Sequence, residues 1–271
     1  MMPELLDTLP QPNRAFRWAQ AIQAAPPALV CSALEPFVDH LFTTRRWMLG
    51  QAAAGYGAWG DVATALNVDP SRLVRVRQVH GAAVVVHRAG EKPPAPLLEA
   101  DIIVTNDASV AIAVQSADCV PLLLVDRRGG AVGAAHAGWR GLAAGVPSAA
   151  VNALRREFGS RPDDVMVAMG PSISGPNYEV RVEVREQFVR AGFPEAALSR
   201  WFAPGERAGH SYFDLWRTAR DQLASAGVRP DQIFSAALCT ADHPDLLCSY
   251  RRDGVAAGRM AAAIRCRPRR P

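Results

Sequence analysis

Three short segments of the sequence place a metal-binding or nucleophilic side chain next to residues that bend the backbone. Arg77-Gln-Val-His-Gly81 pairs a histidine with a glycine, and Ser116-Ala-Asp-Cys-Val-Pro121 puts an acid and a thiol before an apolar run. Ala135-His-Ala-Gly-Trp-Arg-Gly141 carries a second histidine beside glycines. Each segment interrupts or ends an apolar run, where burying an unpaired polar side chain costs roughly a few kcal/mol. These polar side chains are therefore the candidates for chemistry.

The first interpretation is a metal site. His80, Cys119 and His136 offer two imidazoles and one thiolate, the three-ligand set of a catalytic zinc whose fourth position is left for water. Cys119 and His136 are 17 positions apart, enough for one strand and its return, so they can lie side by side. His80 precedes Cys119 by 39 positions, and only the fold can bring it to the other two.

The second interpretation uses the same residues as a nucleophilic pair. A Cys119 thiolate activated by His136 could attack an amide or acyl carbon, and His80 would then be an orienting or spectator group. Taken singly, a histidine more often makes an ordinary hydrogen bond, and a buried cysteine is usually inert packing. Geometry separates the two interpretations, so both stay open at the level of sequence.

Strands and helices must alternate to position these segments. Apolar, β-branched runs predict strands over residues 38–43, 73–79, 82–87, 101–105, 110–114, 120–125, 131–135, 165–169, 233–239 and 256–264. Helical patterns fall at 62–66, 142–158, 182–191 and 214–223. The near-continuous apolar runs indicate strands buried on both faces. The mixture along the whole length favours one α/β domain over residues 1–271.

Composition excludes several classes of protein. The chain has 271 residues, 49% hydrophobic and 21% charged, which is typical of a globular protein and excludes disorder or fibrous repeats. The net charge of +4 matches the four arginines of the tail, Arg265, Arg267, Arg269 and Arg270, so a nucleic-acid groove is not implied. Polar residues break every apolar stretch well short of the ~18 residues of a membrane span.

The cysteines indicate a reducing compartment. Five of them, an odd number, are scattered without a Cys-x-x-Cys pair, which is not a disulfide framework. The N-terminus also lacks the charged-then-apolar layout of a signal peptide. We therefore expect a cytoplasmic protein.

The three segments resemble the signature blocks of the laccase-domain purine nucleoside phosphorylase family, the YfiH-like proteins formerly described as multicopper polyphenol oxidases. Later segments agree with the family in order and extend the resemblance over about residues 38–264. They are Met169-Gly-Pro-Ser-Ile173, Tyr178-Glu-Val180, Phe213-Asp-Leu-Trp216, Cys239-Thr240, Ser249-Tyr-Arg-Arg-Asp-Gly254 and Gly258-Arg259.

The resemblance implies a four-layer αββα domain related to the cytotoxic necrotising factor deamidases. It implies Zn2+, with copper as the other metal, at His80, Cys119 and His136. The implied reactions are phosphorolysis of adenosine, inosine, guanosine and methylthioadenosine, with adenosine deaminase activity in the same pocket. The expected partners are purine nucleosides and phosphate, with neither nucleic acid nor membrane, and the expected state is a monomer or small homo-oligomer.

The resemblance also suggests roles for neighbouring residues. Arg45 matches a family arginine and could hold phosphate through two hydrogen bonds, or form a surface ion pair. Gln78 and Asp118 could orient the ligands or meet substrate, with Asp118 joining Cys119 and His136 as a catalytic residue, or they could stabilise turns. Arg140 could bind an anion or cap the turn before the next helix.

Two departures from the family pattern follow Arg45. Arg46-Trp47-Met48 stands where the family usually has two glycines, and its usual Ser-Leu-Asn-Leu segment is not recognisable in residues 51–59. We expect these loops to form part of the substrate pocket.

Two rival functions use the same residues. One is a cysteine hydrolase or amidase of the same fold, acting on a cell-wall precursor through Cys119. The other is a copper-dependent phenol oxidase (laccase), which a true multicopper centre makes difficult because it needs many more histidine ligands than the six histidines of this chain.

Overall fold

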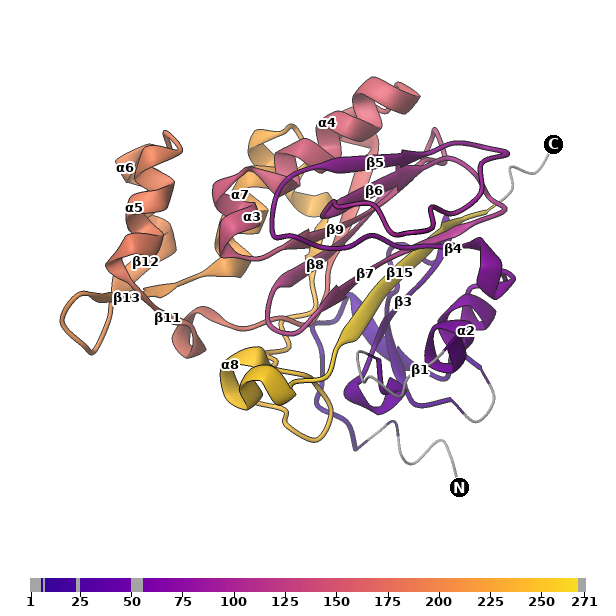
Figure 1. Ribbon diagram of the computed structural model, residues 1–271. Coiled ribbons are helices and arrows are strands. Elements are labelled where there is room, and N and C mark those ends of the chain that lie inside the picture. Colours follow the sequence, from indigo (N-terminus) through magenta and orange to yellow (C-terminus); the bar gives the residue numbers. More distant parts are fainter. Residues whose placement is uncertain (1–5, 7, 23–24, 50–55, 268–271) are drawn as a thin grey trace.

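Two large β-sheets lie face to face at the centre of the protein, with helices on both outer sides (Figure 1). The computed structural model describes residues 6, 8–22, 25–49 and 56–267 of the chain. Within these residues the strands form two six-stranded sheets and one three-stranded sheet.

The first sheet has the strand order β1-β2-β3-β15-β7-β4, and neighbours are antiparallel except for the pair β4 and β7. Its strands are β1 (Phe16–Ala19), β2 (Ala28–Cys31), β3 (Val38–Thr43), β4 (Leu73–Val74), β7 (Ala111–Ser116) and β15 (Met260–Cys266). The strand β15 lies in the middle and carries the buried run Ala261, Ala262 and Ala263. These small side chains let the layers on both faces approach closely.

The second sheet has the strand order β14-β10-β8-β9-β6-β5, with parallel pairs at its two edges. Its strands are β5 (Val84–His87), β6 (Ile102–Thr105), β8 (Val120–Asp126), β9 (Val132–Ala137), β10 (Val165–Met169) and β14 (Ile233–Ser235). Antiparallel pairing of β8 with β9 sets Pro121 opposite His136. The pairing therefore brings the second and third chemical segments of the sequence to one end of this sheet.

Both faces of the second sheet are buried, as the continuous apolar runs predict. On β8, Leu123 and Val125 face the first sheet, whereas Leu122 and Leu124 face the helices. The period-2 alternation of a strand sends successive side chains to opposite faces, so a strand between two layers needs apolar residues at every position.

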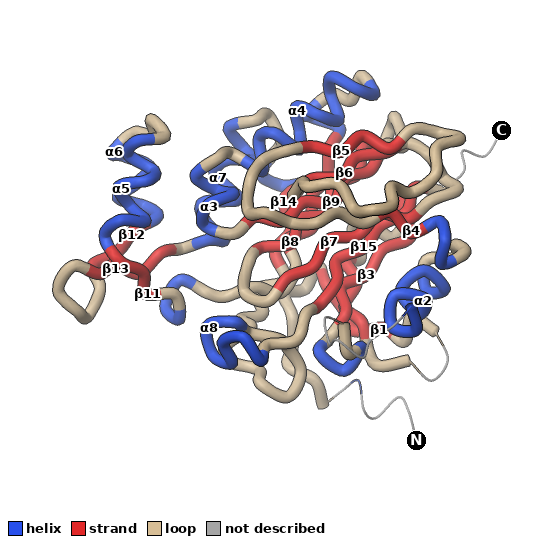
Figure 2. Tube along the Cα trace, viewed as in Figure 1, coloured by secondary structure: helices blue, strands red, loops and turns tan. Residues whose placement is uncertain are grey.

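Helices complete the outer layers (Figure 2). On the second sheet lie α3 (Trp139–Ala143), α4 (Val146–Phe158) and α7 (Leu215–Ser225). On the first sheet lie α2 (Tyr56–Ala65) and a 3-10 helix, Arg45–Trp47. The layers are helix, sheet, sheet and helix, so the expected four-layer αββα architecture is confirmed.

A smaller unit extends from one end of these layers (Figure 1). It contains the three-stranded sheet β11 (Glu179–Arg181), β13 (His210–Phe213) and β12 (Phe202–Pro204), with α5 (Val182–Arg190) and α6 (Glu195–Trp201). The last helix, α8 (Tyr250–Asp253), precedes β15. The sequence analysis did not anticipate the three-stranded sheet, α6 or α8, because their apolar patterns are only three to seven residues long.

The prediction of one continuous helix is wrong in one place. The pattern over 142–158 predicts a single helix, but the structure has α3 and α4 with a break between them at Gly145, whose φ is +79°. Pro147 lies in the first turn of α4, where its missing N–H leaves no hydrogen bond unmade. The proline therefore starts a second helix rather than sitting inside a longer one.

Several strand and helix boundaries also differ from the predictions. The predicted strand 73–79 stops at Val74, and 233–239 stops at Ser235, with Ala237 at a φ of +54°. The predicted strand 256–264 begins only at Met260. Asp61, expected as the N-cap of a helix 62–66, lies inside the longer α2. Residues 51–55 of the unrecognised segment 51–59 lie outside the described part of the chain.

All five cysteines are free. In the described part of the chain, no helix combines the length and the apolar character that crossing a membrane requires.

Candidate metal centre and cleft

The three predicted ligands converge. Cys119 immediately precedes β8, His136 lies in β9, and His80 lies in the turn between β4 and β5. One donor atom from each residue lies within 4.8 Å of the other two. The rings of His80 and His136 meet edge to face, with centroids 4.9 Å apart. The structure thus places His80, which the sequence alone could not, beside the other two residues.

A buried carboxylate that the sequence analysis missed brings His80 into place. Asp101, immediately before β6, is completely buried and accepts hydrogen bonds from three consecutive backbone N–H groups. These are the N–H groups of Val79 (3.1 Å), His80 (3.1 Å) and Gly81 (2.8 Å). His80 adopts a φ of +60°, which turns the chain around this carboxylate. An acid at the first position of a predicted buried strand is the signal that could have identified Asp101.

Asp101 also orients the third ligand. Its Oδ1 lies 2.8 Å from Nδ1 of His136, so the other ring nitrogen, Nε2, is left for Cys119 or a metal. Burial acts to raise the pKa of Asp101, but the hydrogen bonds from His136, Gly81 and Val79 outweigh it and lower the pKa. A carboxylate that holds the outer nitrogen of a histidine fixes its tautomer, as is common behind metal-binding histidines.

The electrostatics of this centre favour a thiolate. Burial alone would raise the pKa of Cys119, but the charge and hydrogen bond of His136, followed by those of His80, lower the pKa to about 6. For His136, burial lowers the pKa, but Cys119 and Asp101 together raise it to about 9. The thiolate is the form of cysteine that binds metal and attacks electrophiles. The same centre can therefore serve either interpretation of the sequence.

A glycine of the third segment is required by close packing. A Cβ atom on Gly138 would lie 2.7 Å from the Cys119 Sγ and 3.2 Å from Cδ2 of His80. Real Cβ atoms essentially never approach a neighbour so closely. Gly138 is also the residue before α3, so it joins β9 to the helix directly beside the three donor atoms.

The centre lies in a cleft of about 1070 Å³. Its walls come from both sheets, the turn around Asp101, the residues preceding Glu99, the start of α3, and α8. The lining residues are Val76, Arg77, Gln78, His80, Pro96, Leu97, Gln115, Ser116, Ala117, Asp118, Cys119, His136, Trp139, Arg140, Tyr178, Tyr250, Arg251 and Arg259. Such a size and mixture of polar and aromatic groups is typical of a small-molecule site.

The cleft carries an excess of positive charge. Arg77 is paired with Glu99. Among the described residues, no acidic side chain pairs with the guanidinium of Arg140, Arg251 or Arg259, which contact aromatic rings or backbone carbonyls instead. Cationic side chains without a counter-charge favour an anionic ligand.

The cleft also contains three aromatic side chains, Trp139, Tyr178 and Tyr250. The Arg140 guanidinium lies 4.3 Å from the centre of the Trp139 ring. Burial, above all, raises the pKa of Tyr178, so its hydroxyl stays protonated. Flat aromatic faces can stack on a planar ligand. The sequence analysis assigned no role to Tyr178, Tyr250, Arg251 or Arg259, although three of its family segments contain them.

Of the residues next to the ligands, Asp118 has its carboxylate engaged. The hydroxyl of Thr240 donates to Oδ1, and the backbone N–H of Arg251 donates to Oδ2 at 2.6 Å. Asp118 is buried and has a φ of +87°, an unusual backbone conformation for a residue other than glycine. Its carboxylate thus joins the turn before Cys119 to the loop that carries α8.

Gln78 and Arg140 line the cleft, but they differ in their hydrogen bonds. The side-chain amide of Gln78 uses both ends on Gln115, donating to its carbonyl at 2.8 Å and accepting from its N–H at 2.7 Å. The side chain of Gln78 therefore pairs with the backbone of β7 as a neighbouring strand would. Arg140 is exposed at the start of α3, where its charge faces the cleft.

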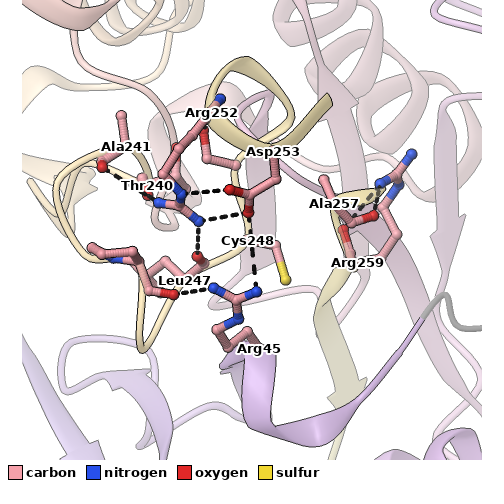
Figure 3. A network of polar contacts seen from close by, with 12 residues as sticks. Arg45, Thr240, Ala241, Leu247, Cys248, Arg252, Asp253, Ala257 and Arg259 are labelled. Carbon is pink, nitrogen blue, oxygen red and sulfur yellow. Dashed lines mark hydrogen bonds and ion pairs between the residues drawn. The ribbon is translucent and has the colours of Figure 1, made fainter. Parts of the chain in front are cut away.

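Arg45 is not among the residues that line the cleft. Its side chain points toward Asp253 (Figure 3). Its guanidinium donates to the carbonyl of Pro244 and lies 4.0 Å from Asp253. The described residues of the neighbouring stretch 46–60 do not line the cleft either, contrary to the expectation that this loop forms part of the pocket. The reason is that residues 45–47 form a 3-10 helix packed on the outer face of the first sheet.

Comparisons with known proteins agree with this fold. A family model described as multi-copper polyphenol oxidoreductase laccase matches residues 57–267. A purine nucleoside phosphorylase of Bacteroides thetaiotaomicron is 37% identical over 164 residues, which span 60% of this chain and 60% of that protein.

Two further proteins extend the comparison. Purine nucleoside phosphorylase YfiH of Escherichia coli is 39% identical over 196 residues, 72% of this chain and 74% of that protein. The crystal structure of the Bacillus licheniformis hypothetical protein YfiH has a TM-score of 0.83 and 26% identity, and the match covers 94% of this chain and all of that one. The chain therefore belongs to the multi-copper polyphenol oxidoreductase laccase family and shares its YfiH-type fold.

Proposed function

We propose that the protein is a zinc-dependent purine nucleoside phosphorylase. Its substrates would be adenosine, inosine, guanosine and methylthioadenosine, and adenosine deamination would take place in the same cleft. The observation that carries the proposal is the cluster of His80, Cys119 and His136 at a cleft lined by aromatic side chains and arginines without acidic partners. The names of the similar proteins from B. thetaiotaomicron and E. coli support the purine nucleoside phosphorylase activity in this proposal.

The donor set fits zinc. Two imidazoles and a thiolate gather within 4.8 Å, Asp101 holds Nδ1 of His136, and Gly138 leaves space for the sulfur. Such nitrogen and sulfur donors suit zinc, and they suit copper as well. When bound, zinc supplies Lewis-acid activation of a water or substrate atom at a fourth position.

The residues of the chain would divide the remaining work. Trp139, Tyr178 and Tyr250 offer ring faces on which a purine base can stack. Arg140 offers a guanidinium that can hold phosphate through two charge-assisted hydrogen bonds. Because Arg45 does not line the cleft and lies near Asp253, we assign phosphate binding to Arg140 instead.

The two reactions differ in their second reactant. In phosphorolysis, a phosphate oxygen forms a bond to the ribose C1′ while the bond from C1′ to the base breaks. The base then leaves with the electron pair and takes up a proton. In deamination, the oxygen of water is added to C6 of adenosine and ammonia leaves. The positive charge of an arginine in the cleft assists only phosphorolysis, because only that reaction uses phosphate. Both reactions need the purine base in the same position.

A product assay tests the function. Protein with known zinc content is incubated with adenosine, with and without inorganic phosphate, and the products are separated by chromatography. We expect adenine and ribose 1-phosphate only when phosphate is present, and inosine in both conditions. Absence of all three products from zinc-loaded protein would overturn the proposal.

Alanine variants test the metal ligands. His80→Ala, Cys119→Ala and His136→Ala should each lower zinc content and activity together, because each removes one of three protein donors. Full zinc occupancy in His80→Ala would remove that residue from the site. Because copper generally binds such donors more tightly than zinc, metal content is interpreted only together with activity.

A cysteine amidase is the second candidate, and one observation favours it. Asp101, His136 and Cys119 form a carboxylate, imidazole and thiolate series, which is the arrangement that activates a nucleophilic cysteine. Such an enzyme forms a covalent acyl intermediate with a cell-wall precursor amide. Mass spectrometry of the protein after reaction with candidate amides would detect that intermediate on Cys119, and its presence would favour this candidate.

A further inference from the structure

Two adjacent arginines on α8, Arg251 and Arg252, have different surroundings. Arg251 is exposed and lines the cleft. The guanidinium of Arg252 is turned toward Thr240 and Leu247 instead (Figure 3). Adjacent residues on a helix point about 100° apart, so they commonly meet different environments. The contacts of each guanidinium indicate its task.

The Arg252 guanidinium is saturated by hydrogen bonds. It donates to both carboxylate oxygens of Asp253, at 2.7 and 2.8 Å. It also donates to the carbonyls of Thr240 (2.9 Å), Ala241 (3.3 Å) and Leu247 (3.0 Å). A guanidinium has five N–H groups, so this set leaves no N–H group for a ligand. Arg252 therefore ties α8 to the two segments that precede it.

The Arg251 guanidinium has spare capacity. Its Nη1 donates to the carbonyl of Glu179 at 2.7 Å, and its central carbon lies 4.6 Å from the centre of the Tyr178 ring. No acidic side chain of the described residues pairs with it. The ring and the carbonyl contact the guanidinium, and its remaining N–H groups have no hydrogen-bond partner among the described residues although Arg251 lines the cleft. An arginine with such contacts can bind an anion through its remaining N–H groups.

Asp118 links this arginine to the metal centre. It accepts from the backbone N–H of Arg251 and from the hydroxyl of Thr240, whose carbonyl in turn accepts from Arg252. Asp118 also immediately precedes the ligand Cys119. Its carboxylate thus holds the N-terminal turn of α8 at a set position relative to the three donor atoms.

We propose that Arg251 is a second anion-binding residue for the phosphate co-substrate, and that Arg252 and Asp118 are positioning residues that hold it over the cleft. Arg251 on α8 and Arg140 on α3 would contact the same phosphate. The assignment rests on the proposed phosphorolysis. Asp118 acts in it through hydrogen bonds to the chain and not as an acid or base.

The test measures phosphate binding and phosphate use separately. Zinc-loaded full-length protein is titrated with inorganic phosphate by calorimetry, and the KM values for phosphate and adenosine are measured in parallel. Arg251→Gln should weaken phosphate binding by on the order of tenfold or more, because a charge-assisted contact is lost. Arg251→Lys should lose less, since the charge remains but the planar fork does not. Arg155→Gln, on an exposed position of α4, is the control for lost net charge.

A double-mutant cycle tests the positioning role. Arg252→Lys cannot replace five hydrogen bonds, so phosphate binding should weaken several-fold while zinc content is unchanged. The same substitution should have little further effect on phosphate binding in the Arg251→Gln protein, since Arg252 acts through Arg251. If Arg252→Lys does not fold, Asp118→Ala takes its place, because alanine can accept neither the Arg251 N–H nor the Thr240 hydroxyl.

Each outcome decides one statement. Phosphate binding by Arg251→Gln that equals the Arg155→Gln control overturns the role of Arg251 while the proposed phosphorolysis stands. Additive effects of the Arg251 and Arg252 substitutions on phosphate binding overturn the positioning role. A wild-type protein that neither binds nor consumes phosphate overturns the proposed phosphorolysis, and this inference with it.

Discussion

At the scale of single residues, one buried carboxylate organises the candidate metal centre. Asp101 holds the turn that presents His80 through three N–H groups and holds the ring of His136 through Nδ1. Two of the three candidate ligands therefore depend on a residue outside the candidate donor set. The pattern is that of a second layer of hydrogen bonds which sets the direction of the donor atoms.

Asp101→Asn should weaken zinc binding on the order of 10- to 100-fold, because the amide cannot accept all the hydrogen bonds that the carboxylate accepts and lacks its charge. Competition with a coloured chelator measures the affinity. Asp126→Asn is the matched control, because Asp126 is also buried and accepts backbone N–H bonds from Arg128 and Gly129, away from the centre. An Asp101→Asn protein with the zinc affinity of this control would contradict the role of Asp101.

Alkylation of Cys119 separates a metal ligand from a free nucleophile. A zinc-bound thiolate is shielded, so iodoacetamide should label Cys119 slowly until a chelator removes the metal. Without metal, the lowered pKa, about 6, keeps the thiolate populated at neutral pH and labelling should be fast. Mass spectrometry locates the label.

The other cysteines provide an internal control for this measurement. Burial, as the largest cause, raises the pKa of Cys31 and of Cys266 to about 11, so both should stay unlabelled in the folded protein. Rapid labelling of Cys119 in the zinc-loaded protein would count against its role as a ligand and favour the amidase.

At the scale of elements, the junction of β9 and α3 packs against the candidate metal centre without room for a side chain. Gly138 leads from the strand into the helix while the Cys119 sulfur and the His80 ring occupy the space that a side chain would need. The close approach of three elements at one residue explains why a glycine stands at this position. Its backbone φ of −78° is accessible to any residue, so the constraint is space and not conformation.

Gly138→Ala should therefore reduce zinc affinity sharply, because the added methyl group displaces Cys119 or His80. Gly60→Ala in α2 is the control, since its Cβ would meet only Pro70 at an ordinary 3.8 Å. Alanine in a helix is favoured over glycine by up to about 1 kcal/mol, so the control should be neutral or slightly more stable. Zinc affinity and thermal unfolding are compared for both variants. Unchanged zinc affinity in Gly138→Ala would show that the centre can move to accept the methyl group.

The helix α8 is the second decisive element. It is only four residues long, yet it presents Tyr250 and Arg251 to the cleft. Such a short helix has too few internal hydrogen bonds to be stable alone, so its position depends on tertiary contacts. The bonds of Arg252 supply these contacts, and Arg45 reaches the same segment through Asp253 (Figure 3).

At the scale of the whole molecule, packing of the two sheets buries some polar side chains away from solvent. His40 on β3 is buried, and its Nε2 accepts the N–H of Cys31 at 2.9 Å. Burial, as the largest cause, lowers the pKa of His40 to about 4. Histidine has a pKa near 6.5 when unfolded, so between pH 6.5 and pH 4 the unfolded chain binds a proton that the folded chain does not.

The stability of the protein should therefore be highest above pH 6.5 and should fall as the pH drops toward 4. For His40 alone, the loss at pH 5 is about 2 kcal/mol of unfolding free energy. Urea unfolding at pH 7.5 and pH 5 measures the change. His40→Gln cannot take up the proton, so its stability should depend less on pH, whatever its absolute stability. An equal pH dependence in both proteins would assign the acid sensitivity to other groups.

Several features of the protein follow from the sequence alone. Residue types in the three segments identify His80, Cys119 and His136, and the spacing of Cys119 and His136 suits a strand and its return, as β8 and β9 show. Continuous apolar runs identify strands buried on both faces, since each position of such a strand meets a hydrophobic layer. These signals are local, because residue type and period-2 patterning act over a few neighbouring positions.

Other features depend on the tertiary structure. Asp101 and His80 meet because three backbone N–H groups require an acceptor. The sequence marks Asp101 only as an acid at the start of a buried strand, and only the fold shows that its carboxylate is this acceptor. Arg45, which the resemblance suggests for phosphate, does not line the cleft, whereas Arg251, to which the sequence analysis assigned no role, does. The packing of a 3-10 helix and of α8 decides which arginine faces the cleft. The single-domain boundaries, the oligomeric state and the cytoplasmic location stay predictions. Contacts between residues distant in the chain depend on the summed packing of all layers, which no local pattern encodes.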